Sequence, residues 1–340
     1  MNLQTRIGIV TALLAAFGGG VAFLSWNGGG GPLEASTDVR WESSSQCRDC
    51  HRDVYDEWFG SHHQIAFTNP EVRALSDDFR KEECMDCHLP RPLAVTGFGN
   101  RTLPRRTHFD EGVGCITCHL GPDGGIVGRN DRPEVPCRPQ RSAAFLSVDA
   151  CASCHNQHGT TDQWRESHYA KQGTDCSSCH MPEVRRTRPD GSARMGRKHV
   201  YDGCHDEATL RSAGRFTVAK DGDEIVLALE NVGAGHNFPT EERHRAVDMV
   251  YRFVRPDGTA GDWQRAWRFR MPYRDEMEPI NPGNAPGEST QLPAGATKAV
   301  RVPVDGDAVA VEARLWYRLT PFVGDDSPMS TLLEERRVEL

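Results

Sequence analysis

Five copies of one pentapeptide place two thiols and an imidazole at a fixed spacing along the first two thirds of the chain. Each copy reads Cys, two variable residues, Cys and His. Thiols three positions apart lie on one side of a helical turn, where both can bond the same flat ring, and the adjacent imidazole can ligate a metal at its centre. This is the attachment pattern of c-type haem. The copies are Cys47–His51, Cys84–His88, Cys115–His119, Cys151–His155 and Cys176–His180.

A single Cys-x-x-Cys would suit a zinc site or a redox dithiol equally well. Five copies, each followed by His, favour haem over both. We therefore predict five covalently bound haem c groups, each with one iron. Thioethers are expected at Cys47, Cys50, Cys84, Cys87, Cys115, Cys118, Cys151, Cys154, Cys176 and Cys179, and proximal iron ligands at His51, His88, His119, His155 and His180.

Composition supports haem independently of the motifs. Only 24 of the 162 residues from 44 to 205 are Leu, Ile, Val or Phe, and there is none from 149 to 183. This is about 15%, below the roughly 20% at which a chain is expected to be disordered. Such a segment cannot offset its ordering entropy with its own side chains. We expect packed porphyrins to supply the missing apolar core.

Nine of the 14 histidines lie outside the motifs, and five of them would suffice to make every iron bis-histidine. The predicted distal ligands are His63, His108, His199, His205 and His236. His62, His158 and His168 remain alternatives, and some histidines must serve other roles.

The N-terminal residues resemble an export signal. Residues 7–26 are uncharged, and twenty residues of helix span about 30 Å, enough for a membrane. We predict a signal peptide or signal anchor over residues 1–30 and a glycine-rich linker over residues 31–45. The protein is expected in the periplasm, held to the inner membrane by residues 7–26.

Composition and residue patterning divide the remaining chain into a haem domain, residues 46–213, a strand-rich domain, residues 214–322, and a tail, residues 323–340. Short alternating segments separated by turns such as Asp221-Gly222 predict an all-β sandwich of the immunoglobulin type. The fold class is therefore α+β. A glycine-rich loop over residues 231–240 presents His236, which we expect to point at the haem domain.

The net charge of the chain limits the classes of partner that it can bind. The net charge is −8 before any propionate is counted, which disfavours nucleic-acid binding. Redox proteins remain as partners, either a quinol-oxidising membrane complex or other cytochromes. Two cysteines, Cys137 and Cys204, lie outside the motifs, and either a disulfide between them or two separate thiols is consistent with an oxidising compartment.

Several segments resemble multihaem c-type cytochromes of the cytochrome c-554 and hydroxylamine oxidoreductase lineage. They are Trp58-x-x-Ser61-x-His63-x-x-Ala66, Gly112-Val113-x-Cys115, Cys176-x-x-Cys179-His180-Met181-Pro182, His199-x-x-x-Gly203-x-His205 and residues 231–240. The resemblance covers roughly residues 45–320, favours His63 over His62, and implies that residues 231–240 open a C-terminal β-sandwich. Two positions depart from the pattern, since Glu241 and Cys204 stand where glycines are usual.

This lineage contains both electron carriers and enzymes. All five motifs are regular, and the histidines outnumber the axial positions, which favours a carrier with closely packed bis-histidine haems and no catalytic residue. The alternative is a multihaem oxidoreductase that reduces or oxidises a small nitrogen or sulfur compound at one open haem.

Overall fold

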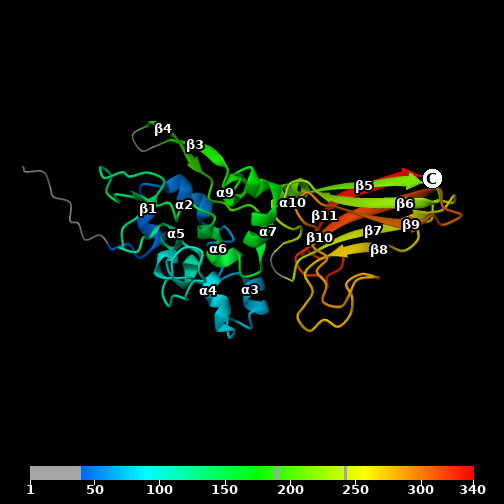
Figure 1. The fold of residues 1–340 in the computed structure, drawn as a ribbon, viewed down its shortest axis with the longest axis horizontal. Coiled ribbons are helices and arrows are strands. Elements are labelled where there is room, and N and C mark those ends of the chain that lie inside the picture. Colours follow the sequence, from blue (N-terminus) through cyan, green and yellow to red (C-terminus); the bar gives the residue numbers. More distant parts are fainter. Residues whose placement is uncertain (1–39, 188–190, 241–242) are drawn as a thin grey trace, which may run out of the picture. The chain divides into compact units, whose positions relative to one another are not determined.

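A computed structural model describes residues 40–187, 191–240 and 243–340, and it contains helices together with mainly antiparallel sheets (Figure 1). The fold is α+β, as predicted. The expected signal or anchor, residues 1–30, lies outside the described residues, as does most of the expected linker. Among the helices that the structure does describe, none combines the length and the apolarity needed to cross a membrane.

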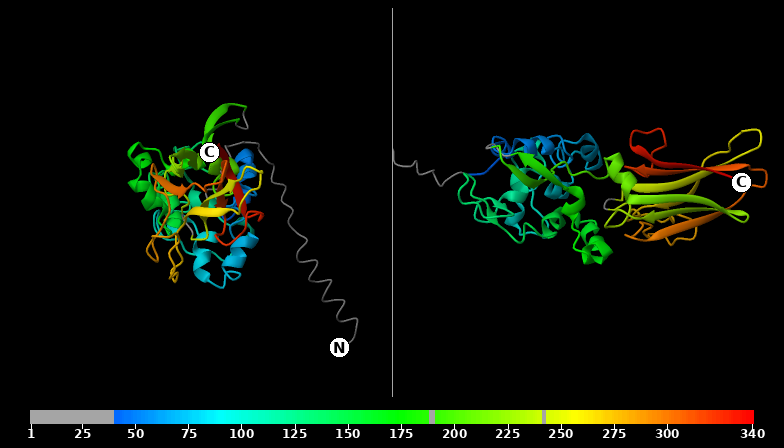
Figure 2. Two further views of the ribbon diagram at one scale, coloured as in Figure 1. Left: turned by 90° about the vertical axis from the view of Figure 1, so that its right-hand side faces the viewer. Right: turned by 90° about the horizontal axis from the view of Figure 1, so that it is seen from above.

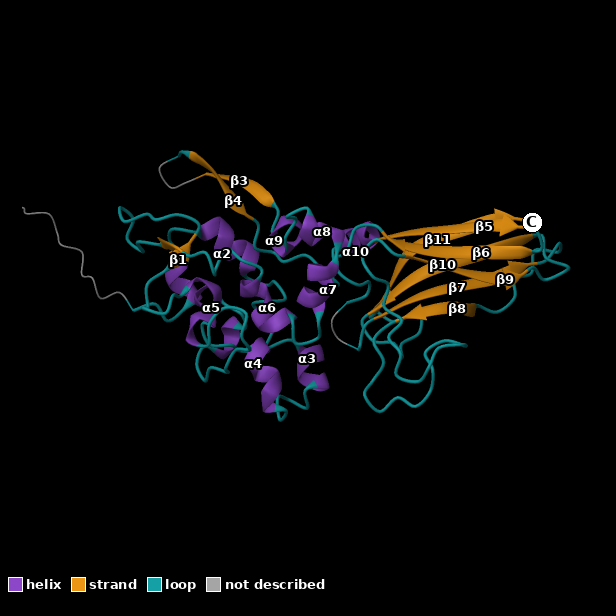
Figure 3. Cartoon of the chain, in the orientation of Figure 1, coloured by secondary structure: helices purple, strands orange, loops and turns teal. Residues whose placement is uncertain are grey.

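The part that carries the five motifs is built from short helices joined by loops (Figure 3). No helix described in it exceeds seven residues. Its elements are η1 Ser44–Cys47, α2 Arg52–Trp58, α3 Pro70–Leu75, η2 Glu82–Cys84, α4 Met85–His88, η3 Leu93–Val95, η4 Phe109–Glu111, α5 Cys115–His119, β1 Val127–Gly128, β2 Gln140–Arg141, α6 Asp149–His155, α7 Thr160–Glu166, α8 His168–Lys171, α9 Cys176–His180, β3 Glu183–Thr187, β4 Ala193–Arg197 and α10 Glu207–Ala213.

In four of the five motifs the proximal histidine is the last residue of a helix, in α4, α5, α6 and α9. Local capping explains the placement of α9. The Asp175 carboxylate accepts a hydrogen bond from the Ser178 backbone N–H at 2.9 Å, which satisfies a helix N-terminus. Helices α5, α6 and α9 therefore carry both thiols and the imidazole on one or two turns, as haem attachment requires, whereas in the second motif Cys84 ends η2 and the rest of the motif lies on α4.

The same part contains little apolar core of its own. Its one described hydrophobic cluster consists of Phe79, Met85 and Leu89. The strand-rich part, with the last turns of α10, instead forms a cluster of eighteen buried residues. This contrast agrees with the composition argument, in which the haem part relies on something other than side chains for its core.

The strand-rich part consists of two antiparallel sheets whose inner faces share that single cluster, and Figure 2 shows its strands from two further directions. One sheet has the order β5-β6-β9 and the other β11-β10-β7-β8. The strands are β5 Gly214–Asp221, β6 Glu224–Asn231, β7 Ala246–Val254, β8 Gln264–Phe269, β9 Thr297–Pro303, β10 Ala310–Arg318 and β11 Ser330–Glu339.

Turn and alternation signals set the registers. The β5–β6 hairpin turns at Asp221-Gly222, where Gly222 has a φ of +63° and Asp221 pairs with Glu224. A positive φ favours glycine, which explains the turn residue. Along β6 the burial alternates strictly, with Ile225, Leu227 and Leu229 completely buried. The predicted hairpin is therefore present with its apolar face inward.

The predicted tail, residues 323–340, is wrong. Ser330–Glu339 forms the edge strand β11, paired antiparallel to β10 along its whole length. The segment has few alternating apolar residues, and only Leu333 is fully buried. Ion pairs also join the side chains of the two strands, such as Arg314 with Glu335 at 2.7 Å and Arg337 with Glu312 at 2.9 Å. Charged edge strands of this kind carry a weak sequence signal.

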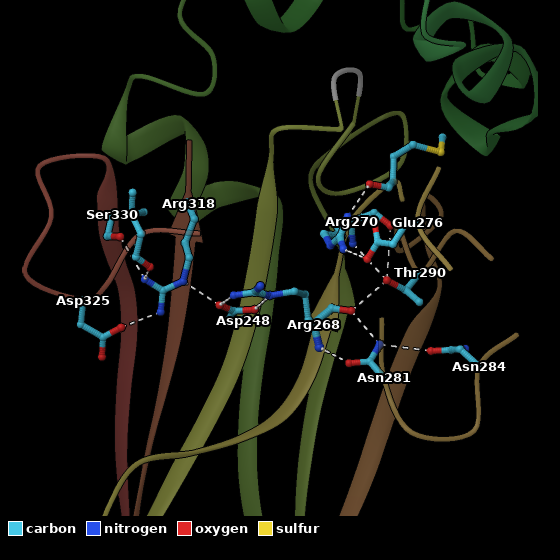
Figure 4. A network of polar contacts seen from close by, with 12 residues as sticks. Asp248, Arg268, Arg270, Glu276, Asn281, Asn284, Thr290, Arg318, Asp325 and Ser330 are labelled. Carbon is cyan, nitrogen blue, oxygen red and sulfur yellow. Dashed lines mark hydrogen bonds and ion pairs between the residues drawn. The ribbon is translucent and has the colours of Figure 1, made fainter. Parts of the chain in front are cut away.

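A buried ionic network fastens the second sheet to its loops (Figure 4). The Asp248 side chain on β7 is 1% exposed and accepts two hydrogen bonds from Arg268, at 2.6 and 2.7 Å, and one from Arg318 at 2.6 Å. Arg318 also bonds Asp325 and Ser330 in the following loop. One carboxylate thus joins β7, β8 and β10 and holds the loop before β11.

Replacing Asp248 with Asn should lower the free energy of unfolding by about 3–5 kcal/mol, because removing one partner of a buried ion pair leaves its guanidinium groups uncompensated. Chemical denaturation of the holoprotein measures this. Asp307→Asn, at an exposed position, is the matched control and should stay within about 0.5 kcal/mol of wild type. Equal stability of the two variants would contradict the network's role.

The pH dependence follows from the same carboxylate. Burial raises the pKa of Asp248, but the hydrogen bonds and charges of Arg268 and Arg318 outweigh it, so its pKa lies below the ordinary value. A depressed folded-state pKa contributes stability above the unfolded value of about 3.9 and loses it as the pH falls through the folded value. Wild type should therefore lose stability more steeply below about pH 4 than Asp248→Asn.

Candidate haem-binding site

Backbone carbonyls orient three of the five proximal histidines. The Nδ1 atoms lie 3.0 Å from the Ala66 carbonyl for His88, 2.9 Å from that of Val127 for His119, and 2.6 Å from that of Asp202 for His180. A carbonyl can only accept, so Nδ1 carries the proton and donates. The Nε2 atom is then the bare nitrogen that can coordinate iron, the usual outer-shell arrangement of a metal-binding histidine.

His51 differs from these three. Its Nδ1 lies 3.3 Å from Nη2 of Arg194, a guanidinium that can only donate. Arg194 lies on β4, and its cross-strand partner on β3 is Arg186. Burial lowers the pKa of His51, and the charge of Arg194 lowers it further. The first motif therefore has a guanidinium beside Nδ1 of its histidine, where His88, His119 and His180 have a carbonyl.

Two predicted distal histidines lie opposite proximal ones at the spacing that an axial pair needs. Metal–imidazole bonds of about 2.0–2.1 Å, with about 1.1 Å more from nitrogen to ring centre, put the centroids of two axial imidazoles about 6.3 Å apart. The His180 and His236 rings have centroids 6.3 Å apart and planes at 9°. His63 and His155 are 6.2 Å apart at 38°. These donor sets fit haem iron.

The segment before motif 3 explains how His63 is held. Gly112 has a φ of +43°, and a Cβ there would collide with the His63 carbonyl. The absence of a side chain lets the Val113 N–H donate to that carbonyl at 2.8 Å, while the Val113 carbonyl accepts from the Trp58 indole at 2.8 Å. Gly112-Val113 and Trp58 thus fix the backbone of the distal histidine.

The loop that carries His236 is fastened at both ends. The fully buried Asn231 donates from Nδ2 to the His236 carbonyl at 2.8 Å and accepts from the Ala234 N–H at 3.1 Å. The Tyr169 hydroxyl donates to the Val232 carbonyl at 2.8 Å. The His236 Nδ1 lies 2.9 Å from the Asn237 carbonyl, which leaves Nε2 for coordination. The loop therefore bridges α8 and β6 with its imidazole in a defined orientation.

His199 lies near the third motif. Burial lowers its pKa to about 4, and the neighbouring His119 contributes to this shift. The neutral imidazole is the form that binds a metal. The Nδ1 atom lies 2.8 Å from the Arg197 carbonyl, so Nε2 is again the available nitrogen. The surroundings of His199 suit a distal ligand of the iron held by His119.

His205 and His108 lie in other surroundings. The His205 ring stacks on His62, with centroids 3.8 Å apart and planes at 15°. His108 begins η4, exposed and with a φ of +49°. Within the described ranges, neither ring contacts a proximal histidine. The distal assignments of His205 and His108 therefore remain predictions without geometric support, and His62 is occupied by its stack with His205.

His168 belongs to the junction with the strands. Its ring packs on Tyr169 with centroids 4.2 Å apart. A Cβ at Gly295 would come within 3.4 Å of its Nδ1 atom. The alternative assignment of His168 as a distal ligand therefore remains a prediction.

Contacts between thiols of different motifs show which motifs are neighbours. The Cys47 thiol lies close enough to Cys115 for the two to shift each other's pKa, and the same holds for Cys87 with Cys154 and for Cys151 with Cys176. Cys118 lies close enough to Cys151 and Cys154 for their charges to interact. Motifs 1, 3, 4 and 5 thus form a continuous series, and motif 2 joins it at motif 4.

The two remaining cysteines have different neighbours. Cys137 lies near Cys50 of the first motif, and burial raises its pKa. Cys204 packs against the core of the strands, and its thiol contacts Arg245. The structure does not join them in a disulfide, so separate thiols are the arrangement observed.

Three positions escaped the sequence analysis. Glu111 is buried and accepts hydrogen bonds from the Ser44 N–H at 2.9 Å and its hydroxyl at 2.7 Å, which ties the start of motif 1 to the segment before motif 3. Tyr201 lies between His63, at 4.0 Å between ring centroids, and His199, at 5.8 Å. Arg186 is described below. Of these three residues, only Tyr201 could have been singled out from the sequence, because it lies within the His199–His205 segment.

Comparisons with known proteins agree with this geometry. Residues 46–120 match the family described as cytochrome c554 and c-prime. A penta-haem cytochrome c552 from Thermochromatium tepidum has a similar fold, with a TM-score of 0.64 and 19% identity over 88% of this chain and 99% of that one. No curated protein matches. The motifs and these matches support a multihaem c-type cytochrome.

A second solved structure, the structural genomics target SoR45, is 10% identical over 38% of this chain and 88% of its own length. Its TM-score of 0.21 is too low to support any conclusion about the fold.

Proposed function

We propose that this protein carries electrons through five covalently bound haem c groups, held at the five motifs and packed closely enough to exchange electrons directly. The observation that carries the proposal is the thiol contact series. Attachment thiols of neighbouring motifs that lie close together would place the rings they hold within a short distance of one another, because each thiol would be directly bonded to its ring. Motifs 1, 3, 4 and 5 then form a path, with motif 2 as a branch.

The chain's own residues have distinct roles in this function. The ten motif cysteines hold the rings, and the haem iron supplies one-electron chemistry when bound. Backbone carbonyls fix three of the predicted proximal imidazoles. His63 and His236 lie opposite two of the proximal histidines, and His199 lies near a third. Two axial imidazoles on one iron exclude other ligands, which suits transfer of electrons without chemistry on a substrate.

The remaining parts of the proposal concern location and partners. An exported protein held to the inner membrane by residues 7–26 would exchange electrons with a quinol-oxidising complex or other cytochromes. The two-sheet part would form an immunoglobulin-like sandwich that supports the His236 loop. Kinship with hydroxylamine oxidoreductases as well as cytochrome c-554 is part of the same proposal, and cell fractionation of the full-length chain tests the anchor.

One observation favours the second candidate function. His205 stacks on His62, and His108 makes no ring contact with a proximal histidine in the described part of the chain. An iron without a distal histidine could bind a small nitrogen or sulfur compound and act as an oxidoreductase. The carrier is favoured because His63, His199 and His236 already lie near three of the proximal histidines.

Absorption and EPR spectra of the oxidised and reduced holoprotein distinguish the two. A carrier should be low-spin at all five irons and should keep its spectrum when nitrite, hydroxylamine or sulfite is added. A high-spin signal from one iron in five that shifts with one of these compounds would establish the oxidoreductase instead.

A further inference from the structure

Two arginines lie directly opposite each other on the β3–β4 hairpin, next to the first motif. Arg186 on β3 pairs with Arg194 on β4. Like charges at directly opposite positions destabilise a sheet. This arginine pair therefore lowers the stability of the hairpin. The hairpin stands out in Figure 3 as a strand pair in a helical part of the chain.

Both guanidinium groups border one cavity. It is lined on one side by Cys50, His51 and the exposed charged residues Asp49, Arg52 and Asp53, and on the other by Arg186, Thr187 and Arg194. Arg194 places Nη2 3.3 Å from the Nδ1 atom of His51. The arginines therefore face the attachment cysteine and the predicted proximal ligand of the same motif.

Arg186 is held rigidly in this position. Its side chain is 5% exposed, and Nη2 bonds the Glu57 carboxylate at 2.5 Å and the Arg197 carbonyl at 2.8 Å. Its Nε is buried without a hydrogen-bond partner in the described residues. Across the hairpin, a Cβ on Gly196 would come within 3.0 Å of that Nε, so glycine makes room for the side chain. Glu57 balances one of the two positive charges.

We propose that Arg186 and Arg194 form a cationic wall that favours the reduced form of the haem at motif 1 and raises its reduction potential. This rests on the proposed electron-transfer function. Reduction adds one electron and no proton, and the added negative charge is stabilised by nearby cations, most strongly in a site shielded from water. The two guanidiniums also suit the carboxylates of haem propionates.

The position of motif 1 gives this potential a consequence. In the thiol contact series it lies at one end, adjoining motif 3 through Cys47 and Cys115. The other end is motif 5, beneath the His236 loop. A high-potential haem at motif 1 would collect electrons at the end away from the strands, so electrons would leave the chain beside the β3–β4 hairpin.

Spectroelectrochemical titration of the holoprotein tests the proposal with Arg194→Gln. One of the five redox steps should move to lower potential, with a roughly tenfold fall in its reduced-to-oxidised ratio at fixed potential, or about 59 mV for one electron. Arg194→Lys should restore most of the shift. Arg185→Gln is the matched control, because Arg185 is the exposed neighbour on the opposite face of β3, and it should leave all steps in place.

Glu57→Gln supplies a second variant of opposite sign, since it leaves Arg186 uncompensated and should raise the same step. If Arg194→Gln loses the haem, this rise still tests the proposal. The proposal is overturned if neither variant moves a redox step, or if Arg194→Gln behaves as Arg185→Gln does. Five reversible steps in wild type with no such shifts would refute the arginine wall alone, whereas fewer steps or ligand-dependent spectra would refute the carrier function.

Discussion

His236→Ala should convert one of five low-spin irons to high-spin and raise its reduction potential. The His236 and His180 rings stand 6.3 Å apart and nearly parallel, so removing one imidazole leaves the iron of motif 5 with a single protein ligand. The coordination bond would also fasten the loop of residues 231–240 to α9, so its loss should increase proteolysis between residues 206 and 214. EPR, potentiometry and limited digestion measure these effects.

His244→Ala is the matched control for His236→Ala. The His244 Nδ1 lies 2.8 Å from the Tyr273 hydroxyl, and its ring contacts Tyr273 edge-on, as expected of a structural histidine. This variant should keep five low-spin irons and wild-type resistance to protease. If His236→Ala gives the same result as the control, the loop has no role as a ligand.

Replacing both Cys176 and Cys179 with Ala should remove one haem and destabilise the haem part by more than about 4 kcal/mol, an unusually large effect for two substitutions at one site. The reason is composition. From 149 to 183 the chain has no Leu, Ile, Val or Phe, so the segment has almost no side-chain core to fall back on. Intact mass and denaturant unfolding followed by haem absorbance measure the outcome.

Cys137→Ala provides the comparison for the double cysteine variant. Cys137 lies near Cys50 but outside the motifs, so this protein should retain all five haems and nearly its full stability. A double variant that loses its haem yet unfolds at the wild-type denaturant concentration would show that the haem contributes little to the core.

The sequence identified the strands well because their signals are local. Alternating apolar residues along 225–229 and 247–253, and the glycine turn at 222, set burial and register without help from distant parts of the chain. The edge strand Ser330–Glu339 was missed because it pairs with β10 through its backbone while most of its side chains are charged, so apolar alternation is weak.

The attachment motifs could also be read directly, since both thiols and the proximal histidine lie within five residues. Distal ligands are a different problem. His63 was favoured by a resemblance, and its position depends on Gly112 and Val113, fifty residues away in sequence. His205 seemed equally good in sequence but stacks on His62. Which imidazole faces which is decided by tertiary packing.

The arginine pair on the hairpin had no sequence signal either. The chain is rich in arginine, so Arg186 and Arg194 did not stand out until strand pairing placed them opposite each other and beside His51. Likewise, the order of the motifs in space became visible only from contacts between thiols far apart in sequence, such as Cys47 with Cys115.

The most direct test of this account is the mass of the denatured holoprotein, taken together with a pyridine haemochrome assay on the same sample. Thioether bonds survive denaturation, so haem attached at every motif should stay with the chain. We predict the mass of the mature polypeptide plus five haems, and five haems per chain by absorbance. Four or fewer would mean that a motif is unused and would contradict the five-haem path.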